Sequence, residues 1–424
     1  MAGLPLTRFD EIGRVLIGVT SDPPLQGSLD RVASQPGPDW WQDLVEEALR
    51  HRVGFHLLQS QSGAGSGRFP QVPRLRLELQ VSEVNRWLDL RLIETRRVLG
   101  HLEKVGLRDC VVLKGPPLCA LYPSPYFHPL ADLDLFAPTD GVDLLLKGLD
   151  DLGYRARMWS YAQGKWHDAT PSELRRRRSE TRDLPAFARS QQGITYAIDV
   201  KTPRHHTEFR PLVLEDMFER AESDEACGIT LRRLSWPDTL LWLAAHTWGH
   251  TVRRRLWLEQ LTTLDRLIRA RITSEGWEQV VSTTERYAKE QERLWPQIDR
   301  AAREYAMQQG MSASWPDVIW EDVRAQVHLP LSLAKQVYGS PVPQSVLEAT
   351  KPADVRLLDL VGDGSGFPLY RFYLWQVDPV RRIFGVQWLP LEELIKQGAL
   401  EGWFGVSHTF ATRLGPERPI EDFA

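Results

Sequence analysis

Apolar residues recur at helical intervals through much of the first hundred residues. The stretch 40–58 shows this spacing, and the stretch 81–105 repeats it with Val84, Trp87, Leu88, Leu92, Val98 and Leu102. Residues 1–38 and 60–67 are instead rich in Pro, Gly and Ser, a composition typical of loops. The pattern predicts a mainly helical N-terminal region, residues 1–108, with a flexible first part.

After residue 108 the pattern changes to short apolar runs bounded by turn residues, which favours strands. A helix is expected over 140–152, with Thr139 as its N-cap and Gly153 just past its end. Strands are expected at 109–115, 132–137, 155–160 and 193–201, with an insertion at 161–192 that has few aliphatic residues. Beyond residue 205 the chain is mainly helical, most clearly at 238–269.

These elements predict an α+β protein. We expect a small mixed sheet within an α/β core of residues 109–205, flanked by the helical region 1–108 and a mainly helical C-terminal domain, residues 206–424.

Asp132 and Asp134 form an Asp-x-Asp pair inside the predicted strand 132–137. Residues two apart on a strand point to the same face. Two carboxylates held that close repel each other, and one stays protonated unless a cation lies between them. The pair therefore predicts a metal site.

Two neighbouring strands extend this site. The first ends in Lys114-Gly115, where glycine would let backbone N–H groups approach an anion at the start of a helix, and lysine would add a positive charge. The second offers Asp199 as a third carboxylate, with an ion pair to Lys201 or Arg204 as its structural alternative. A phosphate cradle beside three carboxylates is typical of phosphoryl or nucleotidyl transfer.

Five features follow one another in the order found in a known family. They are Leu113-Lys114-Gly115, Tyr122-Pro123, Asp132 with Asp134, Asp199, and the helical run from Leu240 to His250. In these features the chain resembles the uncharacterised nucleotidyltransferase family of the DNA polymerase β-like nucleotidyltransferase superfamily, over about residues 40–394.

The resemblance implies a transferase that moves a nucleoside monophosphate from an NTP, such as ATP, to a hydroxyl or phosphate acceptor and releases pyrophosphate. Asp132, Asp134 and Asp199 would hold Mg²⁺ or Mn²⁺, and Asp199 would also lie nearest the acceptor hydroxyl and take its proton. Lys114 and Gly115 would bind the phosphates of the NTP.

Two positions depart from the family pattern. Gly115 is followed by Pro116, which has no N–H to donate, where the superfamily usually has Gly-Ser or Gly-Gly. His128 occupies the place where the family tends to have an arginine before Asp-x-Asp. Both departures favour the alternative hypothesis, a catalytically degenerate protein of the same fold that binds a nucleotide or a partner.

Composition and charge narrow the expected partners. The formal net charge is −4, so a small-molecule or peptide acceptor is favoured over tRNA, which would need a local basic surface. The run Arg175–Arg178 in the insertion is interpreted as a solvated face, or alternatively as a mobile lid. His246 and His250 have a zinc-like spacing, but no third ligand is evident, and helix packing is the favoured role.

The chain shows neither a secretion signal nor an apolar run long enough to cross a bilayer, so a cytoplasmic protein without membrane contact is expected. Its three widely spaced cysteines argue against a disulfide framework.

Overall fold

A computed structural model describes residues 8–22, 37–60, 69–160, 165–179, 184–191, 193–202, 214–252, 257–308 and 323–352. Within these ranges, none of the helices is both long enough and apolar enough to span a membrane. The part of the chain so described is a mixed helix and strand protein, as the sequence predicts.

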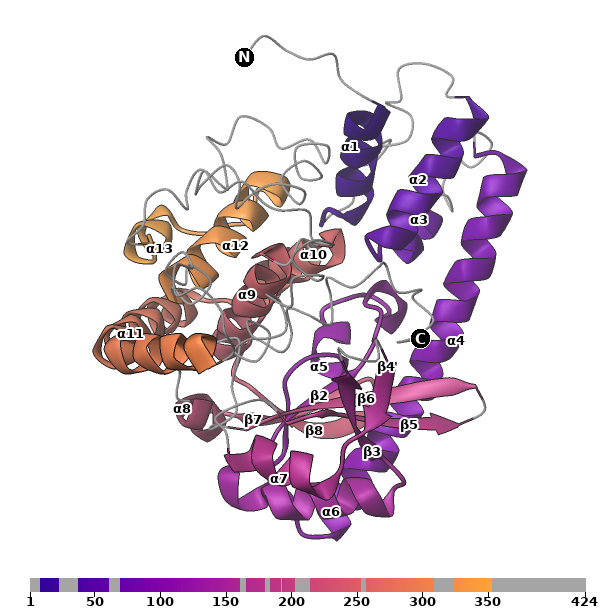
Figure 1. The fold of residues 1–424 in the computed structure, drawn as a ribbon. Coiled ribbons are helices and arrows are strands. Elements are labelled where there is room, and N and C mark those ends of the chain that lie inside the picture. Colours follow the sequence, from indigo (N-terminus) through magenta and orange to yellow (C-terminus); the bar gives the residue numbers. More distant parts are fainter. Residues whose placement is uncertain are drawn as a thin grey trace.

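The strands form one eight-stranded sheet in the order β4-β3-β5-β6-β2-β1-β8-β7 (Figure 1). Their bounds are β1 Val111–Val112, β2 Leu133–Phe136, β3 Arg155–Ser160, β4 Lys165–Asp168, β5 Ala186–Gln191, β6 Ile194–Lys201, β7 Glu222–Ala226 and β8 Ile229–Arg233. Strand β2 runs parallel to β6, and β1 runs parallel to β8, while the other neighbours are antiparallel. The sheet is therefore mixed.

The sheet is larger than the sequence pattern indicated. The insertion 161–192 contains β4, β5 and helix α7 (Pro171–Ser179) rather than a solvated helix or loop alone. Strands β7 and β8 extend the sheet beyond residue 205. Positive φ values at Gly193 (+78°) and Gly228 (+67°) allow the tight turns that join β5 to β6 and β7 to β8.

Helices cover both faces of the sheet. The helices of the N-terminal half are α1 Arg8–Thr20, α2 Pro38–Arg50, α3 Gly54–Ser60, α4 Gln71–Lys104, α5 Pro116–Cys119 and α6 Val142–Asp151. After α7 follow α8 Leu214–Glu219, α9 Trp236–Val252, α10 Leu258–Arg271, α11 Ser274–Gln308, α12 Val323–Tyr338 and α13 Gln344–Ala349. Figure 1 shows α6 and α7 below the sheet and α9 and α10 above it.

Two hydrophobic clusters lie on opposite sides of β2. Leu133 and Leu135 pack with the buried residues of α4 and α6, whereas Phe136 packs with those of α9, α10 and α12. The alternation expected of a strand is therefore present, and both faces of β2 are buried. It places Asp134 on the face of the sheet that looks toward α9 and α10.

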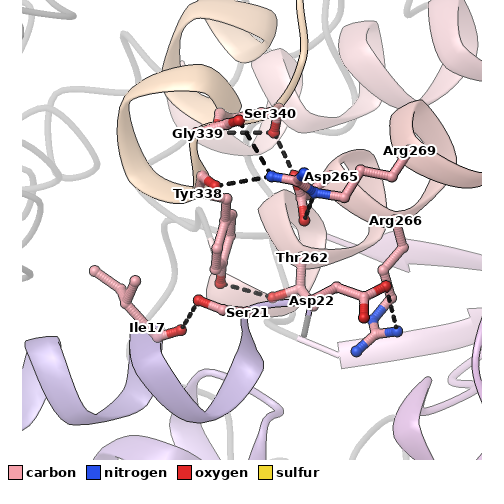
Figure 2. A network of polar contacts seen from close by, with 11 residues as sticks. Ile17, Ser21, Asp22, Thr262, Asp265, Arg266, Arg269, Tyr338, Gly339 and Ser340 are labelled. Atoms are coloured by element: carbon pink, nitrogen blue, oxygen red, sulfur yellow. Dashed lines mark hydrogen bonds and ion pairs between the residues drawn. The ribbon is translucent and has the colours of Figure 1, made fainter. Parts of the chain in front are cut away.

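Helix α10 is fixed at its far end by the polar network drawn in Figure 2. The Tyr338 hydroxyl, at the end of α12, lies 2.8 Å from the Thr262 hydroxyl and 2.8 Å from that of Thr20 in α1. Asp265 accepts hydrogen bonds from Arg269 at 2.9 Å and from Ser340 at 2.6 Å. These contacts tie α10 to both α1 and α12.

Candidate active site

Asp132, Asp134 and Asp199 converge on one point. Strands β2 and β6 pair in parallel with Asp134 directly opposite Asp199, and Asp132 lies two residues before Asp134 on the same face. One oxygen from each of the three carboxylates lies within 4.8 Å of the other two. The strand alternation predicted this convergence, and the structure confirms it.

Lys114 reaches into the same cluster. Its Nζ lies 3.3 Å from Oδ1 of Asp132 and 3.0 Å from Oδ2 of Asp134. Strand β1 delivers it there, because β1 pairs with β2 and the Leu113 N–H donates to the Asp134 carbonyl at 3.0 Å. Burial lowers the pKa of Lys114, but the charges of Asp132 and Asp134 outweigh that effect and raise it above its usual range. The lysine is therefore an ammonium ion held among the carboxylates.

The two carboxylates of the Asp-x-Asp pair have opposite electrostatic states. Burial favours the neutral form of Asp132, but Lys114, His246 and Arg52 overcome this and hold its pKa at about 2. Burial is the main effect at Asp134, and with the carboxylates of Asp132 and Asp199 it raises the pKa to about 8 despite Lys114. Asp132 is therefore ionised at neutral pH, whereas the folded protein disfavours ionisation of Asp134.

The donor set fits a hard divalent cation. Mg²⁺ and Mn²⁺ prefer oxygen ligands, and three carboxylates from two adjacent strands supply them. The Asp134 side chain is only 4% exposed, and its Oδ2 contacts the Lys114 ammonium without the geometry of a hydrogen bond. A buried carboxylate oxygen in that state can accept a metal bond.

The turn after Gly115 has few backbone donors for a phosphate group. Helix α5 is a single turn whose first two residues, Pro116 and Pro117, have no N–H group. The next two N–H groups, of Leu118 and Cys119, both donate to the Gly115 carbonyl. Residues 116–119 therefore offer no free backbone N–H group to an anion, and phosphate binding by Lys114 and Gly115 stays a prediction.

Backbone conformation and close packing explain why a glycine stands at position 115. Its φ is +87°, and a Cβ atom there would lie 2.5 Å from Cδ1 of Leu130. Glycine is needed both for the backbone conformation and for the close packing of Leu130 just before Asp132.

Positive charges near the carboxylates also come from helices that the sequence pattern did not connect with the site. Besides Lys114, the charges that act on Asp132 belong to His246 on α9 and to Arg52 in the turn between α2 and α3. Arg91 on α4 also interacts with Asp132, and it donates to the Leu130 carbonyl at 2.5 Å. The single helix predicted over 40–58 is broken at this turn, which is where Arg52 lies.

His128 and the Tyr122-Pro123 segment dock on α10. Nδ1 of His128 lies 2.9 Å from Oε1 of Glu259, and its ring stacks on Tyr122 with 5.8 Å between the centroids. The Tyr122 hydroxyl lies 2.8 Å from that of Thr263. His128, which stands where the family tends to have an arginine, thus forms a buried pair with Glu259. The positive charges that act on Asp132 come from Lys114, His246 and Arg52.

The remaining candidates are placed as follows. His246 is half-buried on α9, and its charge helps to lower the pKa of Asp132. Arg175 lies exposed on α7. The side chains of His250 and of 176–178 lie outside the described residues, as do His205 and His206.

The match to known proteins covers this whole arrangement. A family model described as an uncharacterised nucleotidyltransferase matches residues 38–304, from α2 into α11. Comparison with curated proteins found no match, and comparison with solved structures found none. The family match includes the three carboxylates, Lys114 and the cations around them, and it spans more than half of the sequence. The chain therefore belongs to the uncharacterised nucleotidyltransferase family.

Proposed function

We propose that the protein is a Mg²⁺- or Mn²⁺-dependent nucleotidyltransferase that moves a nucleoside monophosphate from an NTP to a hydroxyl or phosphate acceptor. The single observation that carries this proposal is the cluster of Asp132, Asp134 and Asp199, with one oxygen of each within 4.8 Å of the others. Family membership supports the same reaction class.

Each residue of the cluster has a distinct part. Asp132, Asp134 and Asp199 would together hold the metal, because one oxygen of each lies within 4.8 Å of the others. Bound there, the ion would neutralise charge on the phosphates and on the attacked phosphorus. Lys114 contributes a second, mobile positive charge within reach of the same phosphates.

The transfer step needs a proton acceptor beside the incoming oxygen. The acceptor oxygen attacks the α-phosphorus, the bond from that phosphorus to the bridging oxygen breaks, and pyrophosphate leaves with the bond electrons. Asp199 lies opposite Asp134 on the neighbouring strand and is the group that takes the acceptor proton.

The acceptor is proposed from charge alone. With a net charge of −4 the chain has no general attraction to a polyanion, so a small molecule or a peptide is favoured and an RNA end is second.

One observation favours the alternative of a degenerate nucleotide- or partner-binding protein. Residues 116–119 have no free N–H donors, so phosphate binding at this turn depends mainly on side chains. Such a protein would still bind an NTP through its cations, but would not turn it over.

Mass spectrometry of the intact acceptor separates these two functions. Candidate small molecules, peptides and tRNA are incubated with each NTP and Mg²⁺, and an added nucleoside monophosphate with matching release of pyrophosphate supports transfer. Saturable NTP binding without modification of any acceptor, and without pyrophosphate, would favour the degenerate protein.

A further inference from the structure

Arg52 occupies a backbone position that normally suits glycine. Helix α2 ends in a Schellman motif, in which the Arg52 N–H donates to the Leu49 carbonyl at 3.0 Å and the Val53 N–H to the Ala48 carbonyl at 2.8 Å. Arg52 itself has a φ of +59°. Glycine adopts this conformation freely, whereas a residue with a Cβ is strained. The geometry of the turn therefore does not explain why an arginine stands at position 52.

The guanidinium of Arg52 is held by the start of α10. Its carbon atom lies 3.9 Å from the centroid of the Trp257 ring, a cation–π stack that fixes the plane of the group. The turn and the helix are joined at the same place, because the N–H of Leu258 donates to Nδ1 of His51 at 3.3 Å, and the N–H of Glu259 donates to the His51 carbonyl at 3.3 Å.

The guanidinium of Arg52 has N–H donors that are not used within the described part of the protein. Among the described residues, the side chain of Arg52 makes no hydrogen bond and no ion pair, so the five N–H groups of its guanidinium have no acceptor in that part of the chain. It is half-buried, and it lies close enough to Asp132 and Glu259 for their charges to act on it. Glu259 is already paired with His128 at 2.9 Å.

We propose that Arg52 binds the triphosphate of the NTP, with its guanidinium stacked on Trp257 and its free N–H groups donating to phosphate oxygens. This inference rests on the proposed nucleotidyl transfer. A planar guanidinium forms strong paired bonds to phosphate, and the stack orients it in advance. It supplies from a side chain the phosphate contacts that the prolines after Gly115 deny to the backbone.

The test uses the full-length protein and a probe without base or sugar, inorganic tripolyphosphate with Mg²⁺, measured by titration calorimetry. Arg52→Gly removes the guanidinium and also relieves the positive φ, so its melting temperature should equal or exceed that of the wild type. Its tripolyphosphate affinity should fall by about tenfold to a hundredfold, as expected for a lost charged hydrogen bond. Arg52→Lys keeps the charge without the fork and should lie between.

Arg50→Ala is the matched control, because it removes the same charge two residues earlier from an exposed side chain that pairs with Glu47. It should bind tripolyphosphate as the wild type does. Unchanged affinity in Arg52→Gly, or no binding by the wild type, would overturn the assignment of Arg52. Failure of nucleotidyl transfer itself appears separately, in the acceptor mass assay, and leaves the affinity comparison intact.

Discussion

The ammonium of Lys114 lies 3.0 Å from a carboxylate oxygen of Asp134, inside the cluster that would hold a metal. A second distance of 3.3 Å, to Asp132, places the same ammonium between both carboxylates. Lys114 and a metal ion therefore compete for the same oxygens, and the lysine must turn away when a metal binds.

Removing this lysine should strengthen metal binding in the absence of nucleotide. For Lys114→Met we expect Mn²⁺ affinity to rise by about tenfold or more, while the melting temperature of the metal-free protein falls because the carboxylates lose their counter-charge. Titration with Mn²⁺ monitored by electron paramagnetic resonance measures the first, and thermal unfolding measures the second. Lys104→Met, at an exposed position, is the control. Equal or weaker Mn²⁺ binding in Lys114→Met would contradict the competition.

Asp134→Asn should abolish transfer without unfolding the protein. Because the pKa of Asp134 is raised to about 8, the folded state keeps a proton that the unfolded chain releases between about pH 4 and 8, and stability falls as pH rises through this range. A neutral amide does not have this loss. We expect activity to fall by at least about a hundredfold, with an unchanged or higher melting temperature in metal-free buffer. Asp109→Asn, which alters an exposed pair with Arg232, should keep full activity. Near-normal turnover of Asp134→Asn in Mg²⁺ would eliminate Asp134 as a ligand.

Gly115→Ala should damage folding rather than nucleotide binding. The positive φ costs about 1–2 kcal/mol for a residue with a Cβ, and the contact with Leu130 adds an overpacking cost of about 1–3 kcal/mol. Denaturant unfolding of Gly115→Ala, Leu130→Ala and the double variant tests this. The glycine substitution should cost at least about 1 kcal/mol less when Leu130 is already truncated. Full stability with lost NTP affinity would restore a phosphate role for Gly115.

The stability of the protein should decrease below pH 6.5 through His51. Burial, with a smaller effect of Arg50, lowers the pKa of His51 to about 4, and its Nδ1 accepts from the Leu258 N–H, so the folded state keeps it neutral. Between pH 6.5 and 4 the unfolded chain binds a proton that the folded chain does not. The loss should reach about 3 kcal/mol by pH 4.

His51→Asn supplies the reference for that prediction, because its side-chain oxygen can accept the same N–H bond and does not titrate. In denaturant unfolding at pH 7, 5.5 and 4.5, the unfolding free energy of the wild type should fall more steeply with decreasing pH than that of the variant. Parallel pH profiles would show that His51 does not carry the effect.

The Arg175–Arg178 run decides between RNA and smaller acceptors. A tRNA-modifying enzyme must neutralise several phosphates, so its affinity would fall by orders of magnitude between about 50 and 200 mM salt. We expect weak tRNA binding, and only a modest change in turnover when the four arginines are replaced by alanine. Tight, salt-sensitive tRNA binding that the four-alanine variant loses would make RNA the favoured acceptor.

Sequence patterns predicted the strands that carry a continuous apolar signal. Strands β2, β3 and β6 lie where the runs 132–137, 155–160 and 193–201 predicted them. Strand β7 was missed because its sequence, Glu222–Ala226, is largely acidic, and only its pairing with β8 makes it a strand. Edge strands such as β7 and β4 draw their conformation from a neighbour, which a local pattern does not report.

The three carboxylates were predictable because they lie in or beside strands with a local apolar signal. The part played by the positive charges of Arg52 and His246 was not. Period-2 alternation fixes Asp132 relative to Asp134, and a strand pattern places Asp199. Arg52, in the turn between α2 and α3, and His246, on α9, are far from Asp132 in the sequence, and nothing in their local runs indicates that their charges act on it. The sequence showed that Pro116 lacks an N–H donor. That the N–H groups of Leu118 and Cys119 are also occupied became evident only from their hydrogen bonds to the Gly115 carbonyl.

The strands that carry the cluster are all interior strands. Within the described sheet, β6, β2 and β1 each have a hydrogen-bonded neighbour on both sides. Opening any of them would break two ladders at once, so their amide hydrogens should exchange among the slowest in the molecule. The backbone positions that carry Asp134 and Asp199 should therefore shift little during catalysis, and adjustment to the substrate falls to rotating side chains such as Lys114 and to the helices above.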